Sequence, residues 1–490
     1  MRRRRPASLV LATLQLVLPL AAASCVTDKV TGERRFALVT WTTAEEQRIG
    51  DSAAPNFEQQ FGGGLPDAAS QRYLAGVVAE MTSHSVRKDD FPWKFEILDA
   101  SEPNAFALPG GYVYVTRGLL QNLESEGEFV AVLGHELGHV EHQHSMLQQN
   151  KAIAGTVLVS LIGVGEELLQ KDPDQPHYVS ALAGMAVPLG LLHFSREQES
   201  EADLRGVHFA HAMGYDPREM KKTFEYFERL ERQAGSSTPS FLRDHPTNET
   251  RIAEIDRTIE KRCPEVISKS PAAFRSPPGP NDRFVQIVAS LKKKAPAYQK
   301  HDEATALLAK SEGDAAALGK ALELANQACN ELPGEPLFQC LAGEIEYSRG
   351  GGDRGRARFE KARAAMKFGA SAGGSGGPSG PSGKEYWKPV FYLGVLDVEA
   401  GHAAPAVANL RRAAELFPDQ PLAAYYLGRA HELNHDSAAA TAAYEQVTQL
   451  APAESALHQK AAERLQALSG EKPATPATPA KPAKRRTTGR

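Results

Sequence analysis

Changes in the spacing of apolar residues mark out the elements of the first third of the chain. Apolar positions at helical spacing predict a helix over residues 68–81. Residues 94–120 instead alternate apolar and polar positions on both sides of a Pro-Gly-Gly turn, a pattern typical of a β-hairpin. Ser125 and the Glu three residues later have capping-box spacing, and the apolar positions after them predict a helix over 126–149. We therefore expect a small β-sheet beside helices, in a mainly α fold of the α+β class.

Two longer apolar runs follow, at residues 152–165 and 179–194, and the second contains Pro188. Both are shorter than the roughly 20 residues that span a bilayer. We expect them to be buried helices of the folded domain. Shallow contact of the first run with a membrane is the alternative.

The second half of the chain is rich in Ala and Leu and repeats itself. Leu393-Gly394 recurs as Leu427-Gly428, at the period of about 34 residues that is typical of tetratricopeptide helix-turn-helix units. We align Leu341-Ala342 with the same position of an earlier unit, although its distance from Leu393 is longer than one period. A Gly-, Ser- and Pro-rich insertion near 369–383 accounts for the excess. An α-helical repeat array is therefore expected over 284–468.

The composition is that of a globular protein, with 42% hydrophobic and 24% charged residues among 490. The net charge of −4 conceals an uneven distribution, because Arg2–Arg5 contribute +4 and the basic residues from Lys472 onward contribute +6. The remainder carries −14, so no nucleic-acid-binding surface is expected. Cys329 and Cys340 could pair in an oxidising compartment, which would leave Cys263 over.

Residues 1–25 have the pattern of an export signal. A basic start, an apolar run of about 14 residues and the small-residue stretch AAASC follow one another. Cys25 resembles the acylated cysteine of a bacterial lipoprotein signal, although Ala22 stands where such signals usually have Leu. The alternative is plain cleavage after Ala23, which leaves Cys25 free. In both cases we expect an exported, periplasmic protein; lipidation would anchor it to a membrane, and Val26 favours the outer one.

Residues 135 to 139 form the sequence HELGH, an H-E-x-x-H motif. On a helix His135 and His139 share a face and can bind one metal ion, while Glu136 lies about 100° away and can reach a water on that ion. A catalytic zinc takes three protein ligands, so a third must come from elsewhere. On a continuous helix His144 faces away, and His142 would make a third ligand from successive turns that is hard to close into a tetrahedron. We expect both to be surface or cleft histidines.

The acidic stretch HFSREQESEADLRG at 193–206 supplies the third ligand. On a helical wheel Glu199 and Asp203 lie on the side of the apolar residues, whereas Glu197 and Glu201 lie opposite. Burying a carboxylate is costly unless it is paired or bound to a metal. We therefore expect Glu199 to be the third ligand of one zinc ion per chain, and Glu197 and Glu201 to be solvated charges.

The motifs VLGHELGHV, SREQESEAD, GYDP and HP…R together resemble the zinc metallopeptidases related to HtpX, Oma and the CaaX prenyl proteases. The similarity is greatest to the BepA-like periplasmic branch and covers about residues 40–262. It implies a zincin-type domain of the gluzincin kind, with Glu199 as third ligand and Asp203 holding a ligand histidine in its tautomer beside Arg251. His245 would lie near the zinc, to stabilise the oxyanion or to cap the metal at rest. A purely structural histidine beside Pro246 is the alternative.

The resemblance also implies a mechanism and a class of substrate. Glu136 would be the catalytic base for water on the zinc, and His245 would assist. One strand resembles the family's substrate-binding edge, which aligns an extended peptide through its backbone, and its residues are Asn104, Ala105, Phe106 and Ala107. We therefore expect a zinc metalloendopeptidase that removes misfolded or unassembled envelope proteins, with repeats that recruit clients or partners. From a different class, the alternative is a chaperone or binding protein of envelope assembly with a latent metal site.

The predicted organisation has five parts. They are a signal peptide at 1–25, a zinc metallopeptidase domain at 26–262, a linker at 263–283, a tetratricopeptide array at 284–468 and a disordered basic tail at 469–490. Expected partners are unfolded or misfolded proteins, proteins bound by the repeats, and a membrane if Cys25 is lipidated.

Overall fold

The computed structural model shows a mainly helical protein with small β-sheets, which confirms the predicted fold class. It describes residues 25–37, 40–151, 194–234, 241, 243, 245, 249–270, 273–275, 282–370 and 385–469. The predicted export signal, the apolar runs before Phe194, most of the Gly-rich insertion and nearly all of the basic tail lie outside these residues. Two compact units divide between Tyr386 and Trp387. Among the helices of the described ranges, none is both long and apolar enough to cross a membrane.

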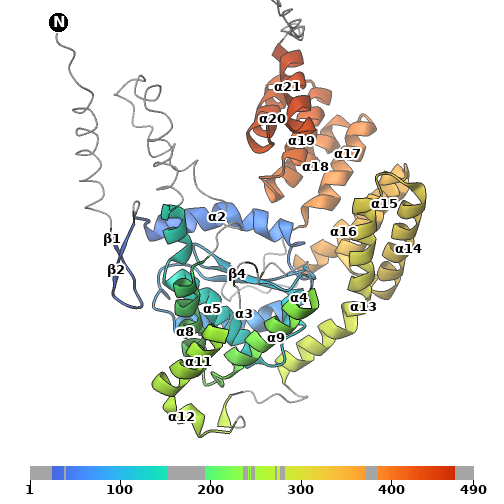
Figure 1. Ribbon diagram of the computed structural model, residues 1–490. Helices are drawn as coiled ribbons and strands as arrows, with labels where there is room; N and C mark the ends of the chain where they lie inside the picture. Colours follow the sequence, from blue (N-terminus) through green and yellow to red (C-terminus); the bar gives the residue numbers. More distant parts are fainter. Residues whose placement is uncertain are drawn as a thin grey trace, which may run out of the picture. The chain divides into compact units, whose positions relative to one another are not determined.

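The first unit contains two small sheets and the longer series of helices (Figure 1). Its elements are β1 (Cys25–Thr27), β2 (Arg34–Phe36), α2 (Thr43–Gln60), α3 (Ala68–Ser83), β3 (Lys94–Leu98), β4 (Ala105–Leu108), β5 (Tyr112–Thr116), α4 (Arg117–Leu120), α5 (Glu126–Glu141), α8 (Arg196–Ala212), α9 (Glu219–Ala234), α11 (Glu249–Arg262), α12 (Pro264–Ile267), α13 (Arg283–Lys310), α14 (Ala315–Glu331), α15 (Pro336–Ser348) and α16 (Gly352–Ala370). The second unit consists of α17 (Trp387–Glu399), α18 (Ala403–Leu416), α19 (Pro421–Leu433), α20 (Ser437–Leu450) and α21 (Ala456–Ser469).

A three-stranded sheet in the order β3-β5-β4 organises the first unit. β3 is parallel to β5, and β4 is antiparallel to it, so β4 and β5 form the predicted hairpin. Gly110 and Gly111 in the turn have φ of +82° and +83°, a conformation that residues with a side chain rarely adopt. Because β4 stands last in the order β3-β5-β4, it is an edge strand of this sheet.

Alternating residues of β5 face different helices, as the period of two requires. Val113 and Val115 belong to the large core that α3 and α5 complete on one face. Tyr112 and Tyr114 pack on the other face with Ala54 and aromatic side chains of α2. The sheet thus lies between α2 and the pair α3 and α5 (Figure 1).

The helix predicted over 126–149 is interrupted, and the prediction of a continuous helix is wrong. α5 ends at Glu141, Gln143 has φ of 55°, and helix resumes at His144. The side chain of Gln143 donates to Glu46 of α2, which ties the turn to a neighbouring helix. The direction of every side chain after the turn therefore differs from that on a straight helix.

Close contact between α5 and α8 depends on residues without large side chains. A Cβ at Gly134 would lie 3.0 Å from Cα of Gly206, and a Cβ at Gly138 would lie 2.9 Å from Cα of Ala202. α5 is buried along its whole length, and Ser125 caps it by accepting from the N–H of Glu128 at 3.0 Å. The two backbones can therefore approach closely enough for side chains of both helices to share one site.

The helices of the second unit reproduce the repeat seen in the sequence. α17 and α19 begin one repeat period apart, and so do α18 and α20. Gly394 and Gly428 hold equivalent places, because a Cβ there would lie 2.5 Å from Leu410 and 2.7 Å from Tyr444, respectively. Each repeat therefore packs its second helix against a glycine of its first.

The alignment of the earlier unit is displaced from its true register. Gly343 stands against Phe359, where a Cβ would lie 2.7 Å from the ring, so Gly343 rather than Ala342 corresponds to Gly394. The stretch inserted between α15 and α17 is correspondingly shorter than the alignment of Leu341-Ala342 implied. A packing position, not the preceding Leu, defines the repeat.

The described cysteines form no disulfide. Cys263, Cys329 and Cys340 are buried and carry free thiols, so the pairing considered for Cys329 and Cys340 is wrong. Burial raises the pKa of the Cys329 thiol, which keeps it protonated and unreactive.

Candidate metal centre

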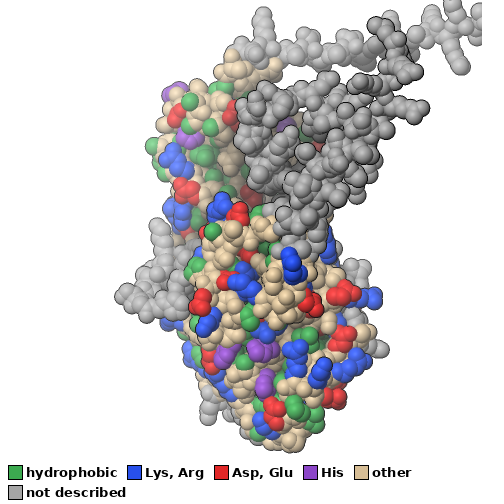
Figure 2. Space-filling model, turned by 90° about the vertical axis from the view of Figure 1, so that its left-hand side faces the viewer, with side chains coloured by type: hydrophobic (Ala, Val, Ile, Leu, Met, Phe, Trp, Pro, Cys, Tyr) green, Lys and Arg blue, Asp and Glu red, His purple; other side chains and the backbone are tan. Residues whose placement is uncertain are grey.

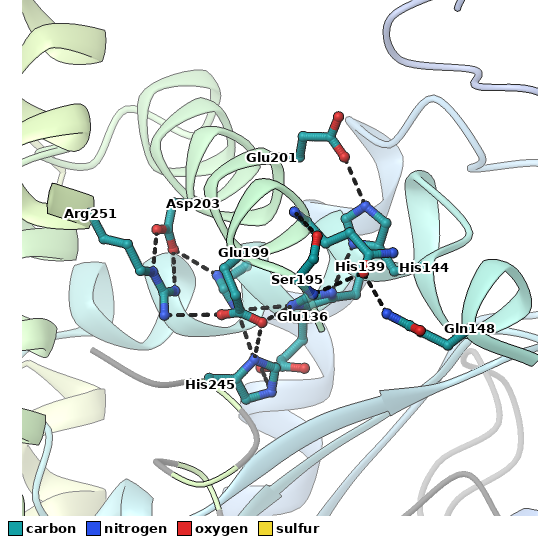
Figure 3. Close-up of polar contacts among 12 residues, drawn as sticks. Glu136, His139, His144, Gln148, Ser195, Glu199, Glu201, Asp203, His245 and Arg251 are labelled. Atoms are coloured by element: carbon teal, nitrogen blue, oxygen red, sulfur yellow. Dashed lines mark hydrogen bonds and ion pairs between the residues drawn. The ribbon is translucent and has the colours of Figure 1, made fainter. Parts of the chain in front are cut away.

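Two histidines of α5 and one glutamate of α8 meet where these helices touch, and Figure 3 labels His139 and Glu199 among them. His135 and His139 are one turn apart, and their Nε2 atoms lie 3.0 Å from each other. Glu199, in the first turn of α8, places Oε2 3.6 Å from Nε2 of His135 and Oε1 3.6 Å from Nε2 of His139. All three residues are at most 4% exposed. The helix contact therefore brings the three expected ligands together.

The donor atoms of this cluster fit a metal ion. Ligands about 2.1 Å from a tetrahedral metal lie roughly 3.4 Å apart, close to the separations of 3.0 and 3.6 Å found here. Nδ1 of each histidine lies 2.9 Å from a partner, Asp203 for His135 and His144 for His139. When both Nδ1 atoms donate, both Nε2 lone pairs point at the same space. The two lone pairs repel each other, and a cation that lies between them and binds both removes this repulsion.

Glu136 lies beside the cluster without belonging to it. Among the described residues, His135, His139, Glu199 and His245 form one of two groups that could share an ion. Glu136 is 2% exposed, and its Oε1 lies 3.7 Å from Nε2 of His245. Its carboxylate is thus close to the ligands, although it is not one of the group that could share the ion.

Asp203 and Arg251 support the ligands from the side away from Glu136. Asp203 Oδ1 accepts from His135, and both oxygens of Asp203 accept from the guanidinium of Arg251 at 2.8 Å. The same guanidinium lies 3.0 Å from Oε2 of Glu199. Burial by itself raises the pKa of Glu199, but His245, His135 and Arg251 outweigh that effect and lower it to about 2. Glu199 is therefore kept ionised in a buried position.

His245 reaches the cluster from the segment between α9 and α11. Its Nδ1 lies 3.0 Å from Oε1 of Glu199 and 3.3 Å from Nε2 of His135. Burial would lower the pKa of His245, but the carboxylates of Glu199 and Glu136 outweigh it and raise the pKa to about 9. The ring lies where it can serve as a further ligand or as a donor to a developing negative charge.

Residues 68–259 match the family described as peptidase family M48. The chain carries an M48 peptidase domain. The match includes α3, the sheet, α5, α8, α9 and most of α11, which are the elements that carry or cover the cluster.

Relatives of the M48 domain include two kinds of protease. The chain is 26% identical over 239 residues to the beta-barrel assembly-enhancing protease of Escherichia coli (strain K12), covering 47% of each chain. It is 32% identical over 171 residues to the mitochondrial metalloendopeptidase OMA1 of Schizosaccharomyces pombe, covering 35% of this chain and 48% of that one. The chain thus spans about half the length of these relatives. Among solved structures, yeast Tom70 is matched over 70% of this chain and 86% of its own, with 13% identity and a TM-score of 0.27.

Two histidines of the M48 domain were placed wrongly from the sequence. His142 and His144 were expected on the surface or in a cleft, but they are 4% and 0% exposed. The turn at Gln143 rotates His144 back onto His139, whereas a continuous helix would point it away. Burial lowers the pKa of His144 to about 4, despite its bond to Glu201. No helical periodicity extrapolated through that turn could have found it.

The helical wheel predicted only in part which acidic residues of α8 are exposed to solvent. Glu197 is exposed, as expected, but the side chain of Glu201 is 26% exposed and bonds to His144 at 2.9 Å. Arg35 of β2 lies on the other side of Glu201. The expectation of a solvated Glu201 is therefore wrong, because a partner distant in sequence covers it.

The remaining predicted residues lie at two other places. Ala105, Phe106 and Ala107 belong to the edge strand β4, and Asn104 directly precedes it. Cys25 is the first residue of β1. In addition, an apolar pocket adjoins the metal centre, lined by Val132, His135, Met220, Thr223, Phe224, Phe227, Phe241, His245 and Arg251.

The ligands themselves are hidden from the surface. On the described part of one face, Figure 2 shows acidic and basic side chains interspersed, with a few histidines grouped between them. His135, His139 and His245 are at most 4% exposed, so they contribute little to any such view.

Proposed function

We propose that the protein is a zinc metalloendopeptidase of the cell envelope that cleaves misfolded or unassembled envelope proteins. The observation that carries this proposal is the buried cluster of His135, His139 and Glu199 with Glu136 beside it. Two imidazoles and one carboxylate are a ligand set typical of catalytic zinc, which keeps one position open. His135, His139 and Glu199 would hold one zinc ion per chain.

The residues around the ion would divide the chemistry between them. When bound, zinc supplies Lewis-acid chemistry, because it polarises the peptide carbonyl and makes water more acidic. Glu136 takes a proton from water as the oxygen attacks the carbonyl carbon, then gives that proton to the leaving nitrogen as the C–N bond breaks. His245, whose ring lies 3.0 Å from Glu199, would donate to the carbonyl oxygen as negative charge develops there.

Substrate would bind as an extended chain on β4. An edge strand offers unpaired backbone groups to a peptide, and such pairing depends on main chain more than on side chains. The pocket beside His135 and His245 presents Phe224, Phe227 and Met220, so it suits an apolar side chain. Unfolded proteins offer both an extended backbone and exposed apolar residues.

The role in the envelope rests on the relatives and on the two ends of the chain. One relative is named a beta-barrel assembly-enhancing protease. The helices after residue 283, with their regular period, would form tetratricopeptide repeats that recruit clients or partner proteins. The segment at 1–25 would direct export to the periplasm. Lipidation of Cys25 would then anchor the protein to the outer membrane.

A second function is favoured by one contact. His245 lies within 3.0 Å of Glu199 and 3.3 Å of His135, so it can occupy the position that substrate needs. A protein whose metal site stays capped in this way would act as a chaperone or binding protein through its repeats.

Metal content and digestion of an unfolded protein distinguish the two functions. Wild type and Glu136→Gln should both hold one zinc ion, and only the wild type should digest reduced, unfolded substrate. If both bind zinc and neither digests it, the binding function is correct. If the wild type binds no zinc, the chain has neither an active nor a capped zinc site, and both proposals are wrong.

A further inference from the structure

Nδ1 of His139 is the ring nitrogen that does not face the metal site, and it begins a series of contacts with side chains that have no part in the proposed mechanism. Nδ1 of His139 lies 2.9 Å from Nδ1 of His144. A histidine that binds a metal through Nε2 keeps its proton on Nδ1 and donates it. Nδ1 of His144 therefore accepts, and the single proton of a neutral His144 is on Nε2. That nitrogen lies 2.9 Å from Oε2 of Glu201, so the carboxylate fixes the tautomers of both rings (Figure 3).

His139, His144 and Glu201 thus form a row of hydrogen-bonded side chains. The hairpin of β1 and β2 contacts the far end of this row, at Glu201. Arg35 donates to Oε1 of Glu201, and the same nitrogen lies 3.0 Å from Oδ2 of Asp28. Asp28 in turn lies 2.6 Å from Nδ1 of His142, whose ring stacks on that of His144 with 5.2 Å between centroids and 9° between planes. Asp28 is 3% exposed and His144 is 0% exposed. The bond between Asp28 and His142 is thus formed away from water, where such bonds are strongest.

The hairpin has little stability of its own. Its strands are three residues long, and isolated two-stranded hairpins are marginal in water. Lys29 at its turn pairs with Asp90 on the body of the domain, but that pair is partly exposed and contributes little. Asp28 is the hairpin residue that bonds to the buried His142, and Arg35 bonds to Glu201, the partner of His144. Docking of the hairpin and order around His144 therefore depend on each other.

We propose that the hairpin β1–β2 is a working part of the metal centre, in which Asp28 and Arg35 position Glu201 and His142, and His144 holds the ligand His139. The inference rests on the proposed metallopeptidase function and adds to it a second supporting row, opposite the one formed by Asp203. Its members are positioning residues, since none of them contacts substrate or metal. The segment that directly follows Cys25 thereby supports the ligand geometry.

A second metal ion is the competing explanation of the same cluster. His142, His144 and Glu201 could each offer one ligand atom, and these atoms lie within 4.8 Å of one another. Two observations disfavour it. Nε2 of His144 carries a proton directed at Glu201 whenever His139 binds metal through Nε2, and the carboxylate of Glu201 already pairs with the guanidinium of Arg35.

Zinc affinity tests the inference independently of activity. We expect His144→Phe, which keeps a ring but cannot accept from His139, to weaken zinc binding about 10- to 100-fold in competition with a chromophoric chelator. His144→Asn can still accept from Nδ1 of His139 and should recover most of the affinity. Arg35→Gln and Asp28→Asn should weaken binding in the same direction. The visible spectrum of the cobalt-substituted protein should change in His144→Phe, because the ligand field reports the orientation of His139.

Matched controls separate this role from a general loss of folding. His208→Phe makes the same change at an exposed histidine of α8 and should leave affinity and spectrum unchanged. Wild-type affinity and spectrum in His144→Phe and Arg35→Gln would overturn the inference while the proposed function stands. Two zinc ions in the wild type, falling to one in Glu201→Gln, would overturn it in favour of a second metal site. Absence of zinc and of digestion in the wild type itself would instead refute the proposed function.

Discussion

Oδ1 of Asp203 lies 2.9 Å from Nδ1 of His135, and this contact directs the other ring nitrogen toward Glu199. Arg251 fixes the carboxylate from the opposite side with bonds of 2.8 Å. Asp203 and Glu199 are one turn apart on α8, so a single helix supplies both a ligand and the residue that orients another ligand. The orientation of the centre is therefore set by the α5–α8 contact.

Asp203→Asn should weaken zinc binding about 10- to 100-fold, because the amide is neutral and holds the proton of His135 less strongly. Chelator competition measures the effect. Asp256→Asn makes the same change at an acid of α11 whose side chain is 46% exposed, and it should bind zinc like the wild type. Equal affinity of all three proteins would contradict a supporting role for Asp203.

Glu199→Gln should lose the metal, since a neutral amide is a poor zinc ligand and leaves Arg251 without one of its carboxylates. Metal analysis after gel filtration measures the loss. Glu197→Gln, two residues earlier on the exposed face of α8, should retain one ion per chain. Retention of zinc by the Glu199 variant would show that the third ligand lies elsewhere.

Gly138→Ala should lower both stability and zinc affinity. Its Cβ would lie 2.9 Å from Cα of Ala202, so α8 must move away from α5, and overpacking of this kind costs about 1–3 kcal/mol. Because α8 carries Glu199, the ligands separate with the helices. Gly76→Ala on α3 meets nothing within 4 Å and should stabilise the protein slightly. Thermal unfolding and chelator titration of both variants test the prediction, and equal behaviour of the two would refute it.

The sequence predicted the parts of the site that depend on helical period alone. His135 and His139 follow from a spacing of four, and Glu199 and Asp203 from one face of a wheel, and the structure places all four together. His144 escaped because a single left-handed residue, Gln143, resets the period, and nothing in the local composition marks that residue as a turn. The partners of Glu201 and His142 were also out of reach, since Arg35 and Asp28 lie 166 and 114 residues away from them.

The sequence likewise predicted some features of the fold and missed others. The hairpin of β4 and β5 follows from alternation around a Pro-Gly-Gly turn, but the parallel pairing of β3 with β5 depends on a crossover that local pattern does not specify. The period of the repeats was visible, whereas the register of the earlier unit required the packing of Gly343 on Phe359. Contacts between distant segments, not propensities, decided each of these points.

Glu128→Gln should remove a pH dependence of stability. Burial, with the charges of Glu219 and Glu124, raises the pKa of Glu128 to about 7, although a bond from the Glu124 N–H opposes the rise. The folded protein then holds a proton that the unfolded chain releases near pH 4.5, so this stability is present below that pH and is lost as pH rises toward 7. The loss is at most about 3 kcal/mol.

Unfolding temperatures at pH 5 and pH 8 measure that loss. Between pH 5 and pH 8 the unfolding temperature of the wild type should fall by more than that of Glu128→Gln. Glu225→Gln, a change at an exposed position of α9, should show the same fall as the wild type. The same shift in Glu128→Gln and wild type would show that this carboxyl is already ionised at pH 5.

Ala107→Pro should slow digestion without affecting the metal. Asn104 accepts from the N–H of Thr116 at 2.9 Å, so by alternation Phe106 also directs its backbone toward β5, while Ala107 directs its N–H outward. Proline at 107 removes one donor to a bound peptide, worth about 1 kcal/mol or roughly five-fold in rate. Phe106→Pro instead breaks the pairing with β5 and should lower the unfolding temperature. Digestion of unfolded substrate at the wild-type rate by Ala107→Pro, with full zinc content, would exclude β4 as the substrate-binding edge.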